Sequence, residues 1–79
     1  MKEKFLRVLL LQMKNLSAQV RNGHFTLDNG FDHEWFRHYQ WKLYGMVDIA
    51  YVIGLLTLNE SIMYTKHIQR IGEHYISSL

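Results

Sequence analysis

Residues 43–60 have the sequence LYGMVDIAYVIGLLTLNE, which joins the most apolar segment of the chain to the start signal of a helix. As far as residue 56, apolar side chains occupy nearly every side of a helix, with Asp48 as the charged residue among them. Residues 57–60 match a capping box, in which the Thr57 hydroxyl and the Glu60 carboxylate each accept a bond from the other residue's backbone N–H. The segment therefore predicts a long helix, a tight turn and another helix.

The remainder of the chain also favours long helices, because its 79 residues contain no proline. Apolar residues at helical spacing predict a first helix over 2–21, a second over 33–56 with Asp32 as its N-cap, and a third over 58–77. The predicted core positions are Phe5, Leu6, Leu9, Leu10, Met13, Leu16 and Val20, then Trp35, Phe36, Tyr39, Leu43, Met46, Val47, Ala50 and Ile53, then Tyr64, Ile68, Ile71, Tyr75 and Leu79. We expect one all-α domain of residues 1–79, with a long central helix and a tight turn into the third.

Two Asn-Gly pairs, at residues 22–23 and 29–30, bracket the clearest loop. Asn-Gly favours a helix stop or a tight turn because both residues tolerate positive φ. Residues 24–27 form either a short extended stub or plain loop. Gly45 and Gly54 interrupt the second helix, where each marks a close approach of another helix or, for Gly54, the point at which the helix unwinds.

The overall composition excludes several classes of protein. A hydrophobic fraction of 48% and an aromatic fraction of 14% are too high for a disordered chain. No segment reaches the roughly 18 uninterrupted apolar residues that a membrane span requires, so we expect no membrane partner. The absence of cysteine fits a reducing compartment, and the N-terminal segment lacks the pattern of a signal peptide. We expect a cytoplasmic location.

We expect no enzymatic activity, no cofactor and no metal site. The serines lack the glycine-flanked turn of a nucleophile, and the glycines form no phosphate-binding loop. Of the five histidines, His67 and His74 are seven residues apart, about 10 Å along a helix, which is too far to share one ion.

The second helix has a further apolar arc that one short chain does not easily cover. Its predicted self-association residues, with two from the first helix, are Val8, Leu11, Trp41, Ile49, Val52 and Leu56. We expect a homodimer through this arc; the alternative is a monomer in which the other helices cover both faces. Asp48 is either a polar anchor of this interface, beside Trp41, Tyr44 and Tyr51, or a solvated residue at its rim.

Two exposed faces are candidate binding surfaces. Methionine adapts its shape, and arginine and histidine are hydrogen-bond donors, so one face of the third helix suits a protein partner. That face comprises Met63, His67, Arg70 and His74. A row of cations on the first helix, Arg7, Lys14 and Arg21, suits phosphate groups. Either face is otherwise ordinary solvated surface.

One part of the sequence resembles a known group of proteins. Residues Trp41-x-x-Tyr44-Gly45, then Asp48-x-Ala50-Tyr51, then 54–60 are similar to a pattern in small phage-encoded and prophage-encoded helical proteins with no assigned activity. The resemblance covers about a quarter of the chain, and it implies a viral accessory protein that inhibits a host system, including a defence system. It implies no catalytic or binding residue.

These observations favour a small non-enzymatic regulator or inhibitor that acts by binding another protein. Its surplus of apolar and aromatic surface is typical of protein contacts. The alternative is a nucleic-acid-binding module that uses Arg7, Lys14 and Arg21.

Overall fold

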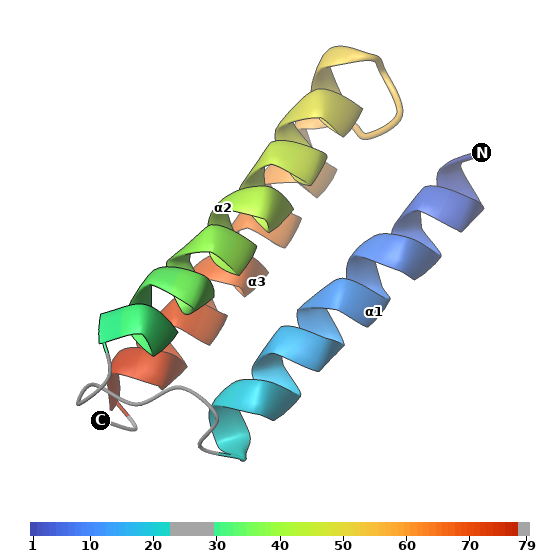
Figure 1. Ribbon diagram of the computed structural model, residues 1–79. Helices are drawn as coiled ribbons and strands as arrows, with labels where there is room; N and C mark the ends of the chain where they lie inside the picture. The colour runs from blue at the N-terminus through green and yellow to red at the C-terminus, as the bar shows by residue number, and fades with distance from the viewer. Residues whose placement is uncertain (23–29, 78–79) are drawn as a thin grey trace.

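The computed structural model describes residues 1–22 and 30–77, and it leaves out the side chains of residues 31–33. These residues form three helices, α1 (Lys2–Arg21), α2 (Gly30–Val52) and α3 (Leu58–Ser77), as Figure 1 shows. Helix is the only regular secondary structure in the described ranges. The predicted all-α, three-helix fold is therefore confirmed.

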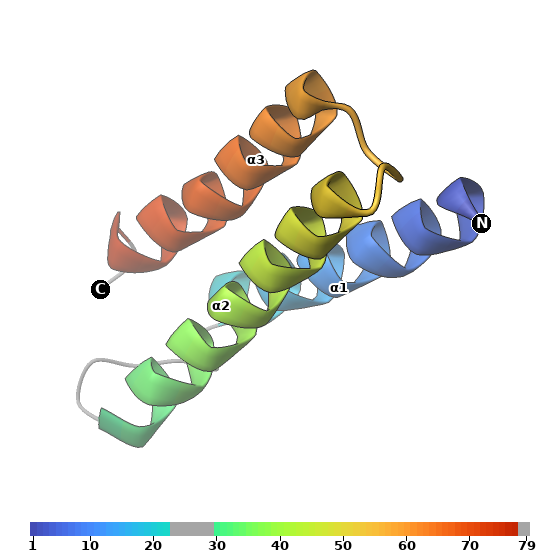
Figure 2. The same ribbon diagram turned by 90° about the horizontal axis from the view of Figure 1, so that it is seen from above.

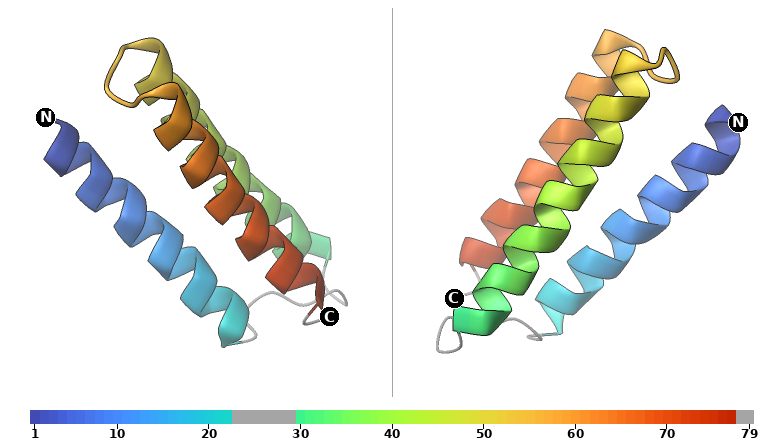
Figure 3. Two further views of the ribbon diagram at one scale, coloured as in Figure 1. Left: turned by 180° about the vertical axis from the view of Figure 1, so that it is seen from behind. Right: turned by 45° about the horizontal axis from the view of Figure 1, so that its top comes forward.

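The three helices form an elongated bundle of 41 × 18 × 18 Å in which every helix packs against the other two. α2 runs antiparallel to α1, and α3 returns antiparallel to α2, so that α1 and α3 are parallel (Figure 2). The N-terminus and the α2–α3 turn consequently lie at one end of the bundle (Figure 3). This arrangement leaves each helix with one outward face.

The core lies between the three helices, and no polar or charged residue is buried among the described residues. α2 and α3 make the most extensive contact. Their rings meet at one end of the core, where the centroids of Phe36 and Tyr75 lie 4.1 Å apart. Burying such apolar side chains is the main force that holds the helices together. The buried hydrophobic residues are Leu9, Met13, Leu16, Val20, Phe36, Leu43, Val47, Ala50, Leu56, Ile68 and Tyr75.

A Schellman motif ends α2. Gly54 has a φ of +81°, which glycine adopts at low cost. The Leu55 N–H donates to the Ala50 carbonyl at 2.8 Å, and the Gly54 N–H donates to the Tyr51 carbonyl at 3.0 Å. These are the two bonds that define the motif, with glycine at its left-handed position. The expectation that Gly54 unwinds the helix is confirmed.

The predicted capping box starts α3 directly after this motif. The Thr57 N–H donates to Glu60 Oε1 at 3.0 Å, and the Glu60 N–H donates to Thr57 Oγ1 at 3.1 Å. A helix stop and a helix start are therefore separated by a single residue, Leu56. This back-to-back arrangement explains why the connection is short enough to force α2 and α3 to lie side by side.

The predicted limits of the second helix, 33–56, are wrong at both ends. α2 begins at Gly30, so Asp32 lies within its first turn, and α2 ends at Val52 because Gly54 reverses the backbone. Three predicted core residues, Leu10, Trp35 and Ile53, are exposed. Leu79 and the predicted strand stub at 24–27 lie outside the described residues.

The glycine at which two helices approach closely is Gly72 and not Gly45. A Cβ atom at Gly72 would lie 2.5 Å from the Gln40 side-chain nitrogen, whereas a Cβ at Gly45 would meet no atom within 4 Å. The close approach of another helix that was expected at Gly45 does not occur within the described chain. The open side of Gly45 faces outward.

Candidate interaction surfaces

The outward side of α2 carries a row of uncovered apolar residues. Trp41, Ile49 and Val52 are 72%, 63% and 74% exposed, and Gly45 lies between Trp41 and Ile49. Their spacing of three and four residues places them on successive turns of one helix side. We call Trp41, Gly45, Ile49 and Val52 the outer face of α2. Scattered single exposed apolar residues are ordinary, but a contiguous row of large ones is typical of an interaction site.

On one flank, the outer face borders the seam between α2 and α1. A cavity of about 210 Å³ in this seam is lined by Asn15 of α1 and Lys42 of α2, among others. Val8 precedes Asn15 by seven residues, and Ile49 follows Lys42 by seven. Because α1 and α2 are antiparallel, both steps of about two turns lead toward the same end of the bundle. Val8 and Ile49 therefore flank the same seam, and Val8 and Leu11 are both about half exposed. The structure thus places the two predicted α1 residues beside the outer face.

On the other flank, the outer face borders a hollow between α2 and α3. Its volume is about 400 Å³, and Asp48 lies at its rim. The residues that line it are Trp41, Tyr44, Gly45, Val47, Asp48, Tyr51, Ser61 and Thr65. Asp48 is exposed, so its carboxylate is solvated and is not a buried charge that needs a partner within the chain. The predicted neighbours Trp41, Tyr44 and Tyr51 line the same hollow.

Of the six predicted self-association residues, five are exposed and one is not. Leu56 is only 3% exposed, because α2 ends before it and the turn directs it into the core. Its assignment to the self-association surface is wrong. The alternative expectation was that α1 and α3 cover both sides of α2, and this coverage is not seen in the described residues. α1 and α3 both pack on α2 and still leave Trp41, Ile49 and Val52 uncovered.

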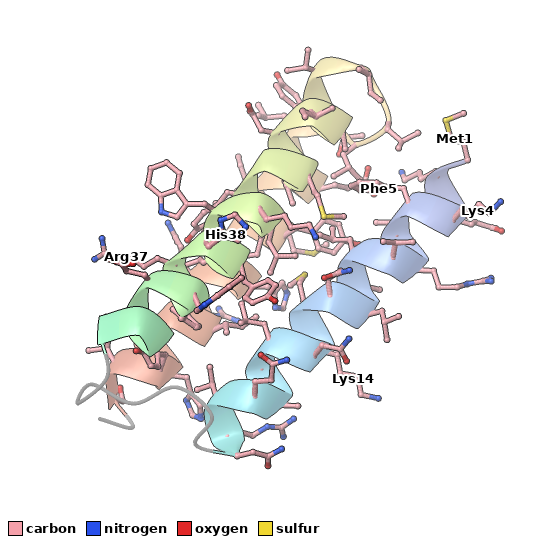
Figure 4. All side chains as sticks on the ribbon, in the orientation of Figure 1. Met1, Lys4, Phe5, Lys14, Arg37 and His38 are labelled. Atoms are coloured by element: carbon pink, nitrogen blue, oxygen red, sulfur yellow. The ribbon has the colours of Figure 1, made fainter. Side chains whose placement is uncertain are left out.

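A second hollow of about 390 Å³ lies farther along the α2–α3 contact, and Gln40 is one of the residues that line it. The Gln40 side-chain amide donates to the Ile68 carbonyl at 3.5 Å and to the Tyr44 hydroxyl at 3.4 Å. Burial raises the pKa of the Tyr44 hydroxyl above its usual value; the bond from Gln40 lowers that pKa and the Glu73 charge raises it. Tyr44 is therefore a neutral hydroxyl at physiological pH. Arg37, at the rim of this hollow, points away from α1 in Figure 4.

The predicted partner-binding face of α3 lies along the side of the bundle that α3 shares with α1. Lys2 of α1 contacts Glu60 of α3, and His67 and His74 follow Glu60 at intervals of seven residues on the same side. Met63, His67, Arg70 and His74 are all exposed. Leu10 of α1, predicted to be in the core, is instead half exposed. Asn15 lies on the side of α1 that faces the α2 seam. Leu10 lies on the other flank of α1, which is the one toward α3. Sequence reasoning missed this apolar addition to the face.

The basic row of α1 is exposed along its whole length. Arg7, Lys14 and Arg21 are all exposed, and none makes an ion pair with another described residue. Figure 4 shows Lys14 pointing away from the other two helices, whereas Phe5 points toward them. All three cations are exposed, and their spacing of seven residues puts them on one side of α1.

Within residues 1–22 and 30–77, no group of three or more histidine, cysteine, aspartate or glutamate side chains is arranged to hold a metal ion. None of the helices in these ranges is long and apolar enough to cross a membrane. Comparison with protein families, curated proteins and solved structures gives no match for this chain. The surfaces of the three helices are therefore the basis for inferring a function.

Proposed function

We propose that this protein is a non-enzymatic regulator that acts by binding another protein, and that it does so as a homodimer. The observation that supports this proposal most directly is the outer face of α2, where three large apolar residues are each more than 60% exposed. Covering them removes apolar area from water, which stabilises an association by about 25 cal/mol for each Å² buried. The outer face is assigned to the second copy of the chain.

The other protein is assigned to the face of α3 that contains Met63, His67, Arg70 and His74. Its polar side chains are hydrogen-bond donors, and Arg70 is a cation. The half-exposed Leu10 and Met63 add an apolar centre beside them. Such a face has apolar residues beside hydrogen-bond donors. It fits a partner whose own apolar contact is bordered by carboxylates or backbone carbonyls, which accept hydrogen bonds from these donors. Binding at such a face is expected to weaken as salt rises.

The resemblance of residues 41–60 to phage helical proteins extends the proposal. Five residues of the resembling pattern, Trp41, Tyr44, Gly45, Asp48 and Tyr51, line the hollow of about 400 Å³ between α2 and α3. We propose on this basis that the protein is phage-derived and inhibits its partner, a component of a host system such as a defence system. A cysteine-free chain suits the reducing cytoplasm in which such an inhibitor would act.

The test is capture of partners from host lysate by three tagged proteins: the wild type, a His67→Ala and Arg70→Ala double variant, and a matched control. The control is Lys66→Ala with Gln69→Ala, which also removes one cation and one polar residue from exposed positions of α3. We expect the wild type and the control to retain the same protein and the His67/Arg70 variant to lose it. Equal retention by all three contradicts docking on this face. No enrichment over an unrelated bait contradicts the proposed function.

A second candidate function, binding to nucleic acid, is favoured by the three exposed cations of α1. Each phosphate that they neutralise releases counterions, so affinity would fall steeply with salt. A gel shift with duplex DNA and with single-stranded RNA tests it, using wild type and a variant in which Arg7, Lys14 and Arg21 are changed to Glu. The second function would be established if the wild type retards the nucleic acid, if rising salt abolishes this shift, and if the triple variant gives no shift. Unshifted probe at low salt would eliminate it.

A further inference from the structure

We propose that two copies of this chain pair their α2 helices antiparallel about a two-fold axis at Gly45, so that Trp41 of each copy enters the hollow beside Asp48 of the other. This geometry rests on the proposed self-association. It adds the direction, the register and the residue that each copy inserts.

The first step concerns Gly45. A Cβ at this position would meet no atom within 4 Å, and the residue lies midway between Trp41 and Ile49. The outer face therefore has a notch with a large apolar side chain on either side of it. Helix axes approach most closely where the contact residues are small, so the notch is the natural crossing point for a second helix.

The second step concerns symmetry. A two-fold axis at Gly45 places each residue level with the one equally far on the other side, so Trp41 lies level with Ile49 of the second copy. By the same rule Val52 lies level with His38, which is also exposed. Such a contact is isologous, and each apolar residue of the outer face is buried twice, once in each copy. The face also carries a donor, the Trp41 indole N–H, and an acceptor, the Asp48 carboxylate, at the same hollow, and this complementary pair is what favours a second copy.

The third step concerns the hollow. Two antiparallel helices related by such an axis meet with like flanks on the same side. Trp41 and Asp48 both lie on the flank toward α3, because both line the hollow with Ser61 and Thr65. They are also nearly the same distance from Gly45 in opposite directions. Trp41 of one copy is therefore level with Asp48 of the other, and it lies at the hollow of about 400 Å³.

The fourth step concerns hydrogen bonding. The indole N–H of Trp41 is a donor only, and the Asp48 carboxylate is an acceptor only. Neither side chain bonds to another described residue, and both are exposed to solvent. An indole that leaves water requires an acceptor, and a carboxylate at the rim of an apolar hollow supplies one. Asp48 thus serves as the polar anchor of the interface while remaining solvated in the single chain.

Cysteine cross-linking tests the geometry directly, because the natural chain has no cysteine. A single Gly45→Cys substitution places two thiols at the two-fold axis, and we expect a disulfide-linked dimer after mild oxidation. Two Cα atoms must lie within about 7 Å for this bond. Val52→Cys alone is expected to stay monomeric on a denaturing gel, because the two introduced cysteines would be roughly 21 Å apart along the direction of the helices. Mixing it with a mass-tagged His38→Cys variant is expected to give a mixed dimer.

Fluorescence tests the insertion of the tryptophan. In a Trp35→Phe variant, Trp41 is the remaining tryptophan, and its emission is expected to move to longer wavelength as dilution separates the copies. Trp41→Ala is expected to raise the dimer dissociation constant at least 30-fold, as for a central interface tryptophan. Asp48→Ala is expected to raise it about tenfold, and Asp48→Asn less, because an amide oxygen still accepts the indole N–H. The matched control is Ile76→Ala, which removes a residue that is 69% exposed on α3 and is expected to change nothing.

The outcomes separate this geometry from self-association itself. A mass near 9.5 kDa by light scattering at micromolar concentration overturns both, since that is the mass of one chain. A dimer in which Gly45→Cys fails to cross-link, or in which Val52→Cys cross-links with itself, overturns the antiparallel register and leaves self-association standing. A dimer whose stability is indifferent to Trp41→Ala overturns the insertion. Binding of another protein by α3 is judged independently, by the His67 and Arg70 variant.

Discussion

Lys2 Nζ lies 2.9 Å from Glu60 Oε1, the same carboxylate oxygen that accepts the Thr57 N–H. One oxygen atom therefore joins the start of α1 to the N-terminal cap of α3. The two helices are parallel, so this contact sets which turn of α1 lies beside which turn of α3. It also aligns Leu10 with the face of α3 proposed to bind another protein.

The first prediction is that this contact depends on pH. The backbone bond from Thr57, and then the Lys2 ammonium, lower the pKa of Glu60 below its usual value. A carboxyl whose pKa is lower in the folded state stabilises the fold above its unfolded pKa, and that contribution is lost as pH falls through the folded value. Glu60→Gln is therefore expected to lower the Tm at pH 7 and to have little effect near pH 3.

Thermal unfolding of wild type and Glu60→Gln between pH 7 and pH 3 checks this prediction. Lys2→Met serves as a second variant, and it should cause a smaller loss at pH 7 because the bond from Thr57 remains. A Tm difference between wild type and Glu60→Gln that stays constant across this range would show that the charge of Glu60 contributes nothing.

The second prediction compares two neighbours in the α2–α3 turn. Leu56 is 3% exposed and Ile53 is 65% exposed, although both are aliphatic residues of the same turn. Leu56→Ala removes buried methyl groups and leaves a cavity, so it should lower the free energy of unfolding by about 3 kcal/mol. Ile53→Ala should change it by no more than about 0.5 kcal/mol. Urea unfolding followed by circular dichroism measures both, and equal effects would place Leu56 at the surface.

The third prediction concerns the Schellman motif. Gly54 has a φ of +81°, which a residue with a Cβ adopts only at a cost. Gly54→Ala should lower the free energy of unfolding by about 1–2 kcal/mol. Gly54→Asn should lower it less, because asparagine tolerates this region better. If alanine proves as stable as glycine in chemical denaturation, the turn between α2 and α3 has a different backbone.

The fourth prediction concerns the contact of Gly72 with Gln40. A Cβ at residue 72 would lie 2.5 Å from the Gln40 amide nitrogen, so Gly72→Ala displaces the side chain that bonds to Ile68 and Tyr44. Alanine is also the better helix former, by up to about 1 kcal/mol. In the wild type these effects should nearly cancel, whereas in a Gln40→Ala background Gly72→Ala should stabilise the protein by about 1 kcal/mol.

A double-mutant cycle of the four proteins, Gly72→Ala, Gln40→Ala, the double variant and wild type, checks the fourth prediction. Residues in contact typically show a coupling of at least about 0.5 kcal/mol. Additive effects of the two substitutions would mean that Gln40 does not pack on Gly72.

Much of the helix pattern could be predicted because it depends on neighbours in the chain. The limits of the first and third helices and the Thr57–Glu60 capping box follow from spacing and from bonds that span three residues. The end of α2 could have been found as well. An apolar residue directly after Gly54 is typical of a Schellman motif, and its two bonds are equally local.

The candidate surfaces were harder to predict, because a helical wheel shows which residues share a side and not what covers that side. Trp41, Ile49 and Val52 belong to the uncovered side of α2, as the sequence indicates. Leu56 was predicted to lie with them because the helix was assumed to continue to residue 56. The chain instead turns over residues 53–56, and Leu56 lies in the core.

The sequence by itself determined that this protein consists of three helices, where α1 and α3 begin and end, and which residues share each side of a helix. Those properties arise from the 3.6-residue repeat and from caps formed by residues next to one another. Only the tertiary structure decided that Leu10 and Ile53 stay exposed, that Gly72 meets Gln40, and that Asp48 borders a hollow shared with α3. These depend on the direction and spacing at which helices distant in the chain pack, and no local pattern contains that information.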